Sequence, residues 1–158
     1  MQEKEIRIPI RVYPTITELP KSHQELILRS RQALTRAYAP YSHFRVGAAI
    51  LLGNGEIIEG NNQENVAFPS GLCAERVAMF YASSRFPDVD IEAIAVAGNP
   101  IQTPITPCGS CRQVLSEYEW KQKRPIRIFL TGLSEEIWEL NSVNDLLPLS
   151  FNHDLKKK

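Results

Sequence analysis

Residues 91–98 read IEAIAVAG, an apolar run of the length and character expected for a strand that is buried on both faces. Helical patterns stand on either side of this run, one over residues 73–84 and one from Cys108 to about Glu119. A further apolar run, IRIFL at 126–130, follows the second helix. Strands separated by helices favour parallel pairing through crossover connections. We therefore expect an α/β protein, a three-layer α/β/α domain with a mixed sheet of about five strands.

The preceding segments add a hairpin and a helix. The runs at 44–52 and 56–60 flank Gly53-Asn54-Gly55, which predicts a β-hairpin. A helical stripe extends over residues 22–38, with Ser22 and Glu25 as the expected capping box. Residues 6–12 alternate like a strand, and Pro9 would confine that strand to a sheet edge.

The expected organisation is a single domain with short flanking segments. Residues 1–20 are expected to form an N-terminal extension, 21–151 the domain and 152–158 a polar tail. A short helix at 142–147, ended by Pro148, would close the domain. A chain of 158 residues is long enough to bury a core of this size.

Composition and charge narrow the class of protein. Eighteen basic and eighteen acidic residues balance, which argues against a nucleic-acid partner. The chain has no apolar run of the roughly 20 residues that span a bilayer, and no signal-peptide core. We expect a cytoplasmic protein without a membrane partner. Its three cysteines are an odd number, which favours thiol or metal chemistry over a disulfide framework.

The cysteines fall into one pair and one single residue. Cys108 and Cys111 form a C-x-x-C motif, which by itself is compatible with half of a zinc site, a redox pair or chance. A structural site of four thiolates would need one more cysteine. Catalytic zinc takes three protein ligands and leaves a fourth position for water, so Cys73 would complete such a site. Both motifs stand at expected helix starts, where thiolates are stabilised.

Charged residues follow the single cysteine closely. Glu75 lies two positions after Cys73 and would take a proton from a water at the metal and return it to a substrate. The alternative is simple complementation of the helix dipole. Arg76, and less strongly Arg112, would donate hydrogen bonds to the sulfurs and offset their charge. A surface salt bridge is the alternative for both arginines.

With these motifs the chain resembles the zinc-dependent cytidine deaminase family, in its homotetrameric free-nucleoside branch. The deaminase signature appears as Cys73-Ala74-Glu75 with Pro107-Cys108-Gly109-Ser110-Cys111. The resemblance covers roughly residues 22–151 and extends to four blocks in order: APYSHFRVGAA (39–49), GNNQENVAFPSGLCAER (60–76), PCGSCRQVL (107–115) and LLPLSF (146–151). It implies a cytidine deaminase-like fold, one zinc ion per subunit and hydrolytic deamination of cytidine and 2′-deoxycytidine in pyrimidine salvage.

The resemblance also implies a set of substrate-binding residues. Asn62 and Glu64 would hold the ribose, Phe44 would pack against the nucleoside, and the Ala74 backbone would orient the base. Phe151 would reach into a neighbouring subunit's pocket, so that active sites are shared in a homotetramer. Each has a plainer alternative: a core aromatic for Phe44, turn residues for Asn62 and Glu64, and a C-terminal anchor for Phe151. Phe68 stands where many relatives have tyrosine, so a hydroxyl contact would be absent.

Three rival functions remain at this point. One is deamination of another cytosine compound, such as an aminoacyl nucleoside. Another is editing of a base in RNA or DNA, which the neutral charge disfavours. The third is a zinc-stabilised binding module without catalysis, for which Glu75 beside an open metal position would have no use.

Overall fold

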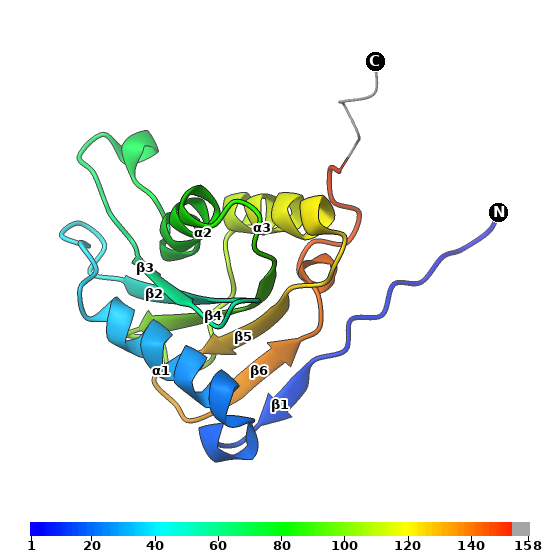
Figure 1. Cartoon of the computed structure of the whole chain (residues 1–158), viewed down its shortest axis with the longest axis horizontal. Coiled ribbons are helices and arrows are strands. Elements are labelled where there is room, and N and C mark those ends of the chain that lie inside the picture. The colour runs from blue at the N-terminus through cyan, green and yellow to red at the C-terminus, as the bar shows by residue number, and fades with distance from the viewer. Residues whose placement is uncertain (153–158) are drawn as a thin grey trace.

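A mixed sheet of six strands separates one helix from a pair of helices in the computed structural model, which describes residues 1–152 (Figure 1). The α/β class and three-layer arrangement are confirmed, with one strand more than expected. The last residues of the predicted polar tail, 153–158, lie outside the described residues. The strands are β1 (Arg11–Tyr13), β2 (Arg45–Leu52), β3 (Ile57–Asn61), β4 (Ile91–Asn99), β5 (Arg127–Thr131) and β6 (Ile137–Leu140). The helices are α1 (Lys21–Leu34), α2 (Ala74–Arg85) and α3 (Gly109–Gln122), with short 3₁₀ turns at Ile16–Glu18, Phe68–Ser70 and Val143–Asp145.

The strand order is β1-β6-β5-β4-β2-β3, and β4 with β5 is the parallel pair. The connection between these two strands is the one that contains α3, as expected for a parallel crossover. All other neighbouring strands pair antiparallel. Successive side chains of β2 point to opposite faces of the sheet, and both faces are covered by helices. Ala48 and Ile50 pack in the core on the side of α2 and α3, whereas Ala49 and Leu51 pack in the core on the side of α1.

Helix α1 is shorter than the predicted helix at 22–38. It begins after Pro20, so Ser22 lies inside the helix and no side chain caps it, and the predicted capping box is wrong. The helix ends at Leu34, and the backbone that follows forms hydrogen bonds outside the helix. Among these, Tyr38 N donates to Asn62 O at 3.0 Å. This turn brings the segment after α1 beside the polar loop that follows β3.

The sheet edge near the N-terminus also differs from expectation. The predicted strand at 6–12 is confined to β1, Arg11–Tyr13, beyond Pro9, and residues 1–10 are exposed. Its partner β6 was not predicted, because four residues, IWEL, are too short to show a clear period. The predicted helix at 142–147 is a single 3₁₀ turn, Val143–Asp145, capped by Ser142. Among the described residues, no helix is long and apolar enough to cross a membrane.

Candidate functional site

Three cysteines meet where α2 and α3 begin. Cys73 is the N-cap residue of α2, Cys108 is the N-cap residue of α3, and Cys111 lies in the first turn of α3. The Sγ atoms of Cys73 and Cys108 are 3.8 Å apart, those of Cys108 and Cys111 are 3.5 Å apart, and all three lie within 4.8 Å of one another. Zinc–sulfur bonds of about 2.3 Å in tetrahedral geometry place sulfurs about 3.8 Å apart. The described residues add no fourth His, Cys, Asp or Glu to the cluster, so it fits a zinc site with three thiolate ligands.

Hydrogen bonding differentiates the sulfurs. Hydrogen bonding with Cys111 lowers the pKa of Cys73 to about 5, against the effect of burial and with a contribution from Arg76. The same contact and burial raise the pKa of Cys111. Arg76 Nη2 donates to Cys73 Sγ at 3.6 Å, and this bond raises the pKa of the guanidinium. Arg76 therefore lies where it can offset the charge of a Cys73 thiolate.

Glu75 is enclosed beside the sulfurs. It lies in the first turn of α2, and only 4% of the residue is exposed. Burial, reinforced by the charge of Cys73, raises the pKa of Glu75 to about 7. Ala74, the first residue of α2, is fully buried next to it. A nearly fully buried carboxyl group thus lies next to a candidate cation site.

Arg112 has a different role from the one considered for it. Its Nε donates to Pro107 O at 2.7 Å, its Nη1 to Leu146 O at 2.8 Å and its Nη2 to Thr106 Oγ at 3.2 Å. The guanidinium is thus directed to the loop before Cys108 and to the C-terminal segment rather than to the sulfurs.

A pocket of about 560 Å³ opens beside Cys73 and Arg76. Asn62 and Glu64 line it, so the structure brings these two predicted residues to the same hollow as Cys73, a candidate metal ligand. The full lining is Tyr41, Ser42, Asn62, Gln63, Glu64, Asn65, Phe68, Gly71, Leu72, Cys73 and Arg76. A hollow of this size can hold a nucleoside-sized molecule.

Hydrogen bonds hold the two polar side chains of this pocket in place. Asn62 Oδ1 accepts from Val46 N at 2.8 Å, and Asn62 Nδ2 donates to Phe44 O at 2.9 Å. Glu64 accepts from Tyr41 N at 2.9 Å and from the Ser42 hydroxyl. The Ser42 hydrogen bond contributes most to lowering the pKa of Glu64, so the carboxylate stays charged.

Tyr41 and Ser42 line the candidate pocket and were not predicted from the sequence as site residues. Their only sequence signal was membership in the APYSHFRVGAA block. The Tyr41 ring meets the Phe68 ring edge-on, with centroids 6.0 Å apart. Phe68 is 76% exposed, so this aromatic pair forms an open wall of the pocket.

The two predicted substrate-binding phenylalanines do not line this pocket within one chain. Phe44 is half-buried just before β2, and its backbone carbonyl serves Asn62. Phe151 is 64% exposed, and its carbonyl accepts a hydrogen bond from Gln113 Nε2 at 2.8 Å. The structure thus brings Asn62, Glu64 and the sulfurs together, and leaves Phe151 outside.

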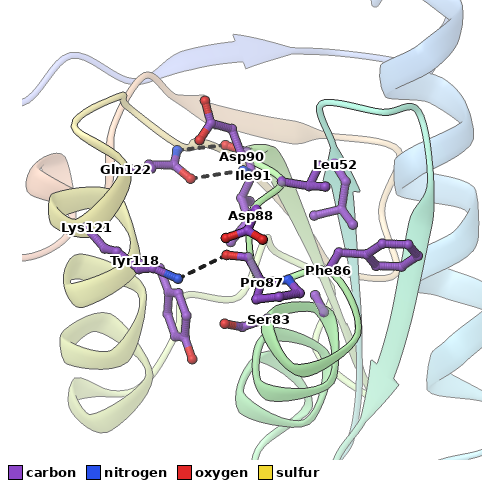
Figure 2. A pocket seen from close by; sticks show the side chains of 12 residues that line it. Leu52, Ser83, Phe86, Pro87, Asp88, Asp90, Ile91, Tyr118, Lys121 and Gln122 are labelled. Carbon is purple, nitrogen blue, oxygen red and sulfur yellow. Dashed lines mark hydrogen bonds between the residues drawn. The ribbon is translucent and has the colours of Figure 1, made fainter.

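A second hollow lies at the opposite end of α2 (Figure 2). Two of its polar side chains hold neighbouring backbone: Gln122 bonds both backbone groups of Ile91 at 2.9 Å, and Lys121 donates to Pro87 O at 3.2 Å. A 12-residue helix is about 18 Å long, so this hollow is remote from the sulfurs. It has no cysteine in its lining.

Comparisons with known proteins point to one family. The family model described as "Cytidine and deoxycytidylate deaminase zinc-binding region" matches residues 20–124. Cytidine deaminase from Halalkalibacterium halodurans is 41% identical over 81% of this chain and 92% of its own length, and that from Sporosarcina psychrophila is 40% identical over 83% and 92%. Among solved structures, the cytidine deaminase from Burkholderia pseudomallei superimposes with a TM-score of 0.73 at 39% identity, covering 82% of this chain and 98% of that one.

Proposed function

This chain belongs to the cytidine deaminase family, and we propose that it uses Cys73, Cys108, Cys111 and Glu75 to hydrolyse cytidine and 2′-deoxycytidine to the uridines with release of ammonia. The observation that carries the proposal is a trio of sulfurs at tetrahedral spacing beside a buried carboxyl group. Neither a redox pair nor a surface salt bridge requires that combination.

Cys73, Cys108 and Cys111 would hold one zinc ion per subunit. When bound in such a site, zinc supplies Lewis acidity and lowers the pKa of water from about 15.7 to near 7. Arg76, which donates to Cys73, would limit the excess negative charge of three thiolates. The two helix N-termini add further positive potential at the same place.

Glu75 would move the protons of the reaction. It takes a proton from the attacking water and delivers it to N3 of the cytosine ring, while the water oxygen bonds to C4. It then transfers the second water proton to the amino group, so that the C4–N bond breaks and ammonia leaves. Burial of the carboxyl group keeps bulk water from competing for these protons.

The pocket beside Cys73 would receive the nucleoside. Asn62 and Glu64 line it and offer an amide and a carboxylate to the ribose hydroxyls. Ala74, between Cys73 and Glu75, would contribute its backbone to the base. Phe44 would support the pocket from the start of β2, with its carbonyl holding Asn62 in orientation.

The complete site would require other copies of the chain. We propose a homotetramer in which Phe151 enters the pocket of a neighbouring subunit. The exposed Phe151, the open pocket and the family membership support this arrangement. Sedimentation equilibrium measures the subunit number directly. The cytoplasmic location expected from the sequence remains part of the proposal.

Replacement of Glu75 tests the mechanism. Glu75→Ala is expected to retain one zinc per subunit, since the three sulfurs remain, and to lower kcat for cytidine by about 10²–10⁴-fold. Loss of the cytosine absorbance band measures turnover, and atomic absorption measures zinc. The isosteric Glu75→Gln should behave alike, because the amide cannot carry the proton.

Glu56→Gln is the matched control, because Glu56 is exposed at the hairpin turn away from the sulfurs. Near-normal turnover by Glu75→Ala would contradict the proton-shuttle role. A zinc-loaded wild-type protein that leaves cytidine unchanged would instead favour another cytosine compound or a non-catalytic zinc module.

A further inference from the structure

The two residues that follow Cys111 both hold the C-terminal segment of the chain. Arg112 Nη1 donates to Leu146 O at 2.8 Å, and Gln113 Nε2 donates to Phe151 O at 2.8 Å. These carbonyls stand at the two ends of LLPLSF, residues 146–151. The N-terminal part of α3 therefore contacts both ends of this segment.

Arg112 also connects the segment to the metal-binding turn. Its Nε and Nη2 donate to Pro107 O and Thr106 Oγ, at 2.7 and 3.2 Å, in the loop that leads directly into Cys108. One guanidinium thus spans the residues before Cys108 and the start of the C-terminal segment. Its planar fork of donors suits simultaneous bonds in different directions.

The residues between the two anchors have partial support of their own, because Leu147 N donates to Val143 O at 3.1 Å and only Leu149 among them is exposed. They form no helix or strand, and Leu149 has a positive φ of 61° while 91% exposed. A leucine side chain rarely adopts such a backbone conformation, so the path of the chain beyond Pro148 depends on the anchor at Phe151.

Further along α3, Glu119 fixes the chain just before this segment. Its carboxylate accepts from Ser142 Oγ at 2.6 Å, Val143 N at 2.9 Å and Asn144 Nδ2 at 3.0 Å. Because this network fixes residues 142–144, Arg112 and Gln113 determine only the position of the residues that follow, 146–151.

We propose that Arg112 and Gln113 are positioning residues that hold residues 146–151 on α3 and thereby set where Phe151 is presented. The second half of this inference rests on the substrate role proposed above for Phe151. The C-x-x-C turn and the segment that carries Phe151 then share one scaffold, so placement of the metal ligands and of the aromatic side chain is coupled through Arg112.

Native-state proteolysis tests, without reference to activity, whether Arg112 and Gln113 hold residues 146–151 on α3. In Gln113→Glu the donor to Phe151 O is replaced by an oxygen, and in Arg112→Lys a single ammonium cannot serve all three acceptors. With low chymotrypsin, release of the peptides beyond Leu149 and Phe151, followed by mass spectrometry, is expected to be about tenfold faster in both variants. Glu117→Gln, an exposed change on the same helix, is the control. Release rates equal to wild type in both variants would contradict the proposal that Arg112 and Gln113 hold residues 146–151.

Kinetics tests the link to the substrate. Gln113→Glu is expected to raise KM for cytidine about five- to tenfold, with kcat changed less than twofold and full zinc content. In a Phe151→Ala background the same change should add nothing, because Gln113 acts through Phe151. Independent, multiplying effects would overturn that coupling. A third outcome separates the two halves of the inference. If peptide release is faster in Gln113→Glu and Arg112→Lys but Phe151→Ala leaves KM for cytidine unchanged, the anchoring of residues 146–151 is supported and the substrate role of Phe151 is wrong.

Discussion

Glu139 on β6 is a charged side chain enclosed by the sheet edge, with no exposed side-chain surface. Tyr13 Oη donates to it at 2.6 Å, Arg127 Nε donates at 2.9 Å, and Arg11 Nη1 lies 3.6 Å away. Burial acts to raise the pKa of Glu139, but the hydrogen bonds from Tyr13 and Arg127 hold it below the usual value. The carboxylate is thus kept charged and joins β1 to the body of the sheet.

The pH dependence of stability reports this arrangement. A carboxyl group whose pKa is lower in the folded state stabilises the fold above its unfolded pKa of about 4.3, and this stabilisation is lost as pH falls through the folded pKa. Glu139→Gln is therefore expected to lower the free energy of unfolding by about 1–3 kcal/mol at pH 7 and by progressively less below pH about 4. Urea unfolding at several pH values measures the difference. Glu56→Gln should show no such trend, and a constant Glu139→Gln deficit at all pH values would contradict the assignment.

At the scale of elements, the position of α2 depends on a glycine in the neighbouring strand. A Cβ atom on Gly60 of β3 would lie 2.5 Å from Ala78 N and 2.6 Å from Ala74 O, both backbone atoms of α2. The helix therefore packs against β3 more closely than any side chain there would permit. Because Cys73 is the N-cap residue of this helix, the close approach also sets the position of one proposed zinc ligand.

Substitution of that glycine should disturb both packing and metal binding. Gly60→Ala is expected to lower the free energy of unfolding by about 1–3 kcal/mol, since backbone must shift, and to weaken zinc retention against a chelator. Gly53→Ala is the control, because its Cβ would meet Asp90 O at an ordinary 3.5 Å. Thermal unfolding and a zinc-chelator competition measure the two effects. Unchanged zinc retention in Gly60→Ala would separate the helix position from the metal site.

At the scale of the whole molecule, the N-terminal extension falls into two parts. Residues 1–10 are exposed and extend away from the sheet, whereas β1 pairs with β6 and supplies Tyr13 to Glu139 (Figure 1). In this way β1 covers an edge that β6 would otherwise present, and exposed strand edges favour association with other chains.

Two truncations separate these parts. Removal of residues 1–10 is expected to change the melting temperature by less than about 2 °C, because these residues are exposed. Removal of residues 1–14 should lower it by about 5 °C or more and promote aggregation, because Glu139 loses Tyr13 and the β6 edge is uncovered. Calorimetry and light scattering measure both. Equal stability of the two truncated chains would show that β1 contributes nothing to the sheet.

Most of the fold and the group of three cysteines could be predicted, because both depend on residues that are close together in the sequence. The hairpin, the buried strand at 91–98 and the cysteine trio depend on residue types and spacings within short windows. Strand β6 was missed because its four residues show too little pattern. Of the three partners of Arg112, Leu146 could not be predicted because it is 34 positions away in the chain.

The amino-acid sequence was enough to identify the chemical groups of the candidate site: three cysteine sulfurs, a carboxyl group two residues from one of them, and helix starts that favour thiolates. Three features became visible only in the folded chain: Glu75 is buried, Asn62 and Glu64 share the pocket of Cys73, and Arg112 holds Leu146 rather than a sulfur. The physical reason is that ligand type and helix capping depend on neighbouring residues, whereas burial and long-range hydrogen bonds arise only when the sheet brings distant segments together.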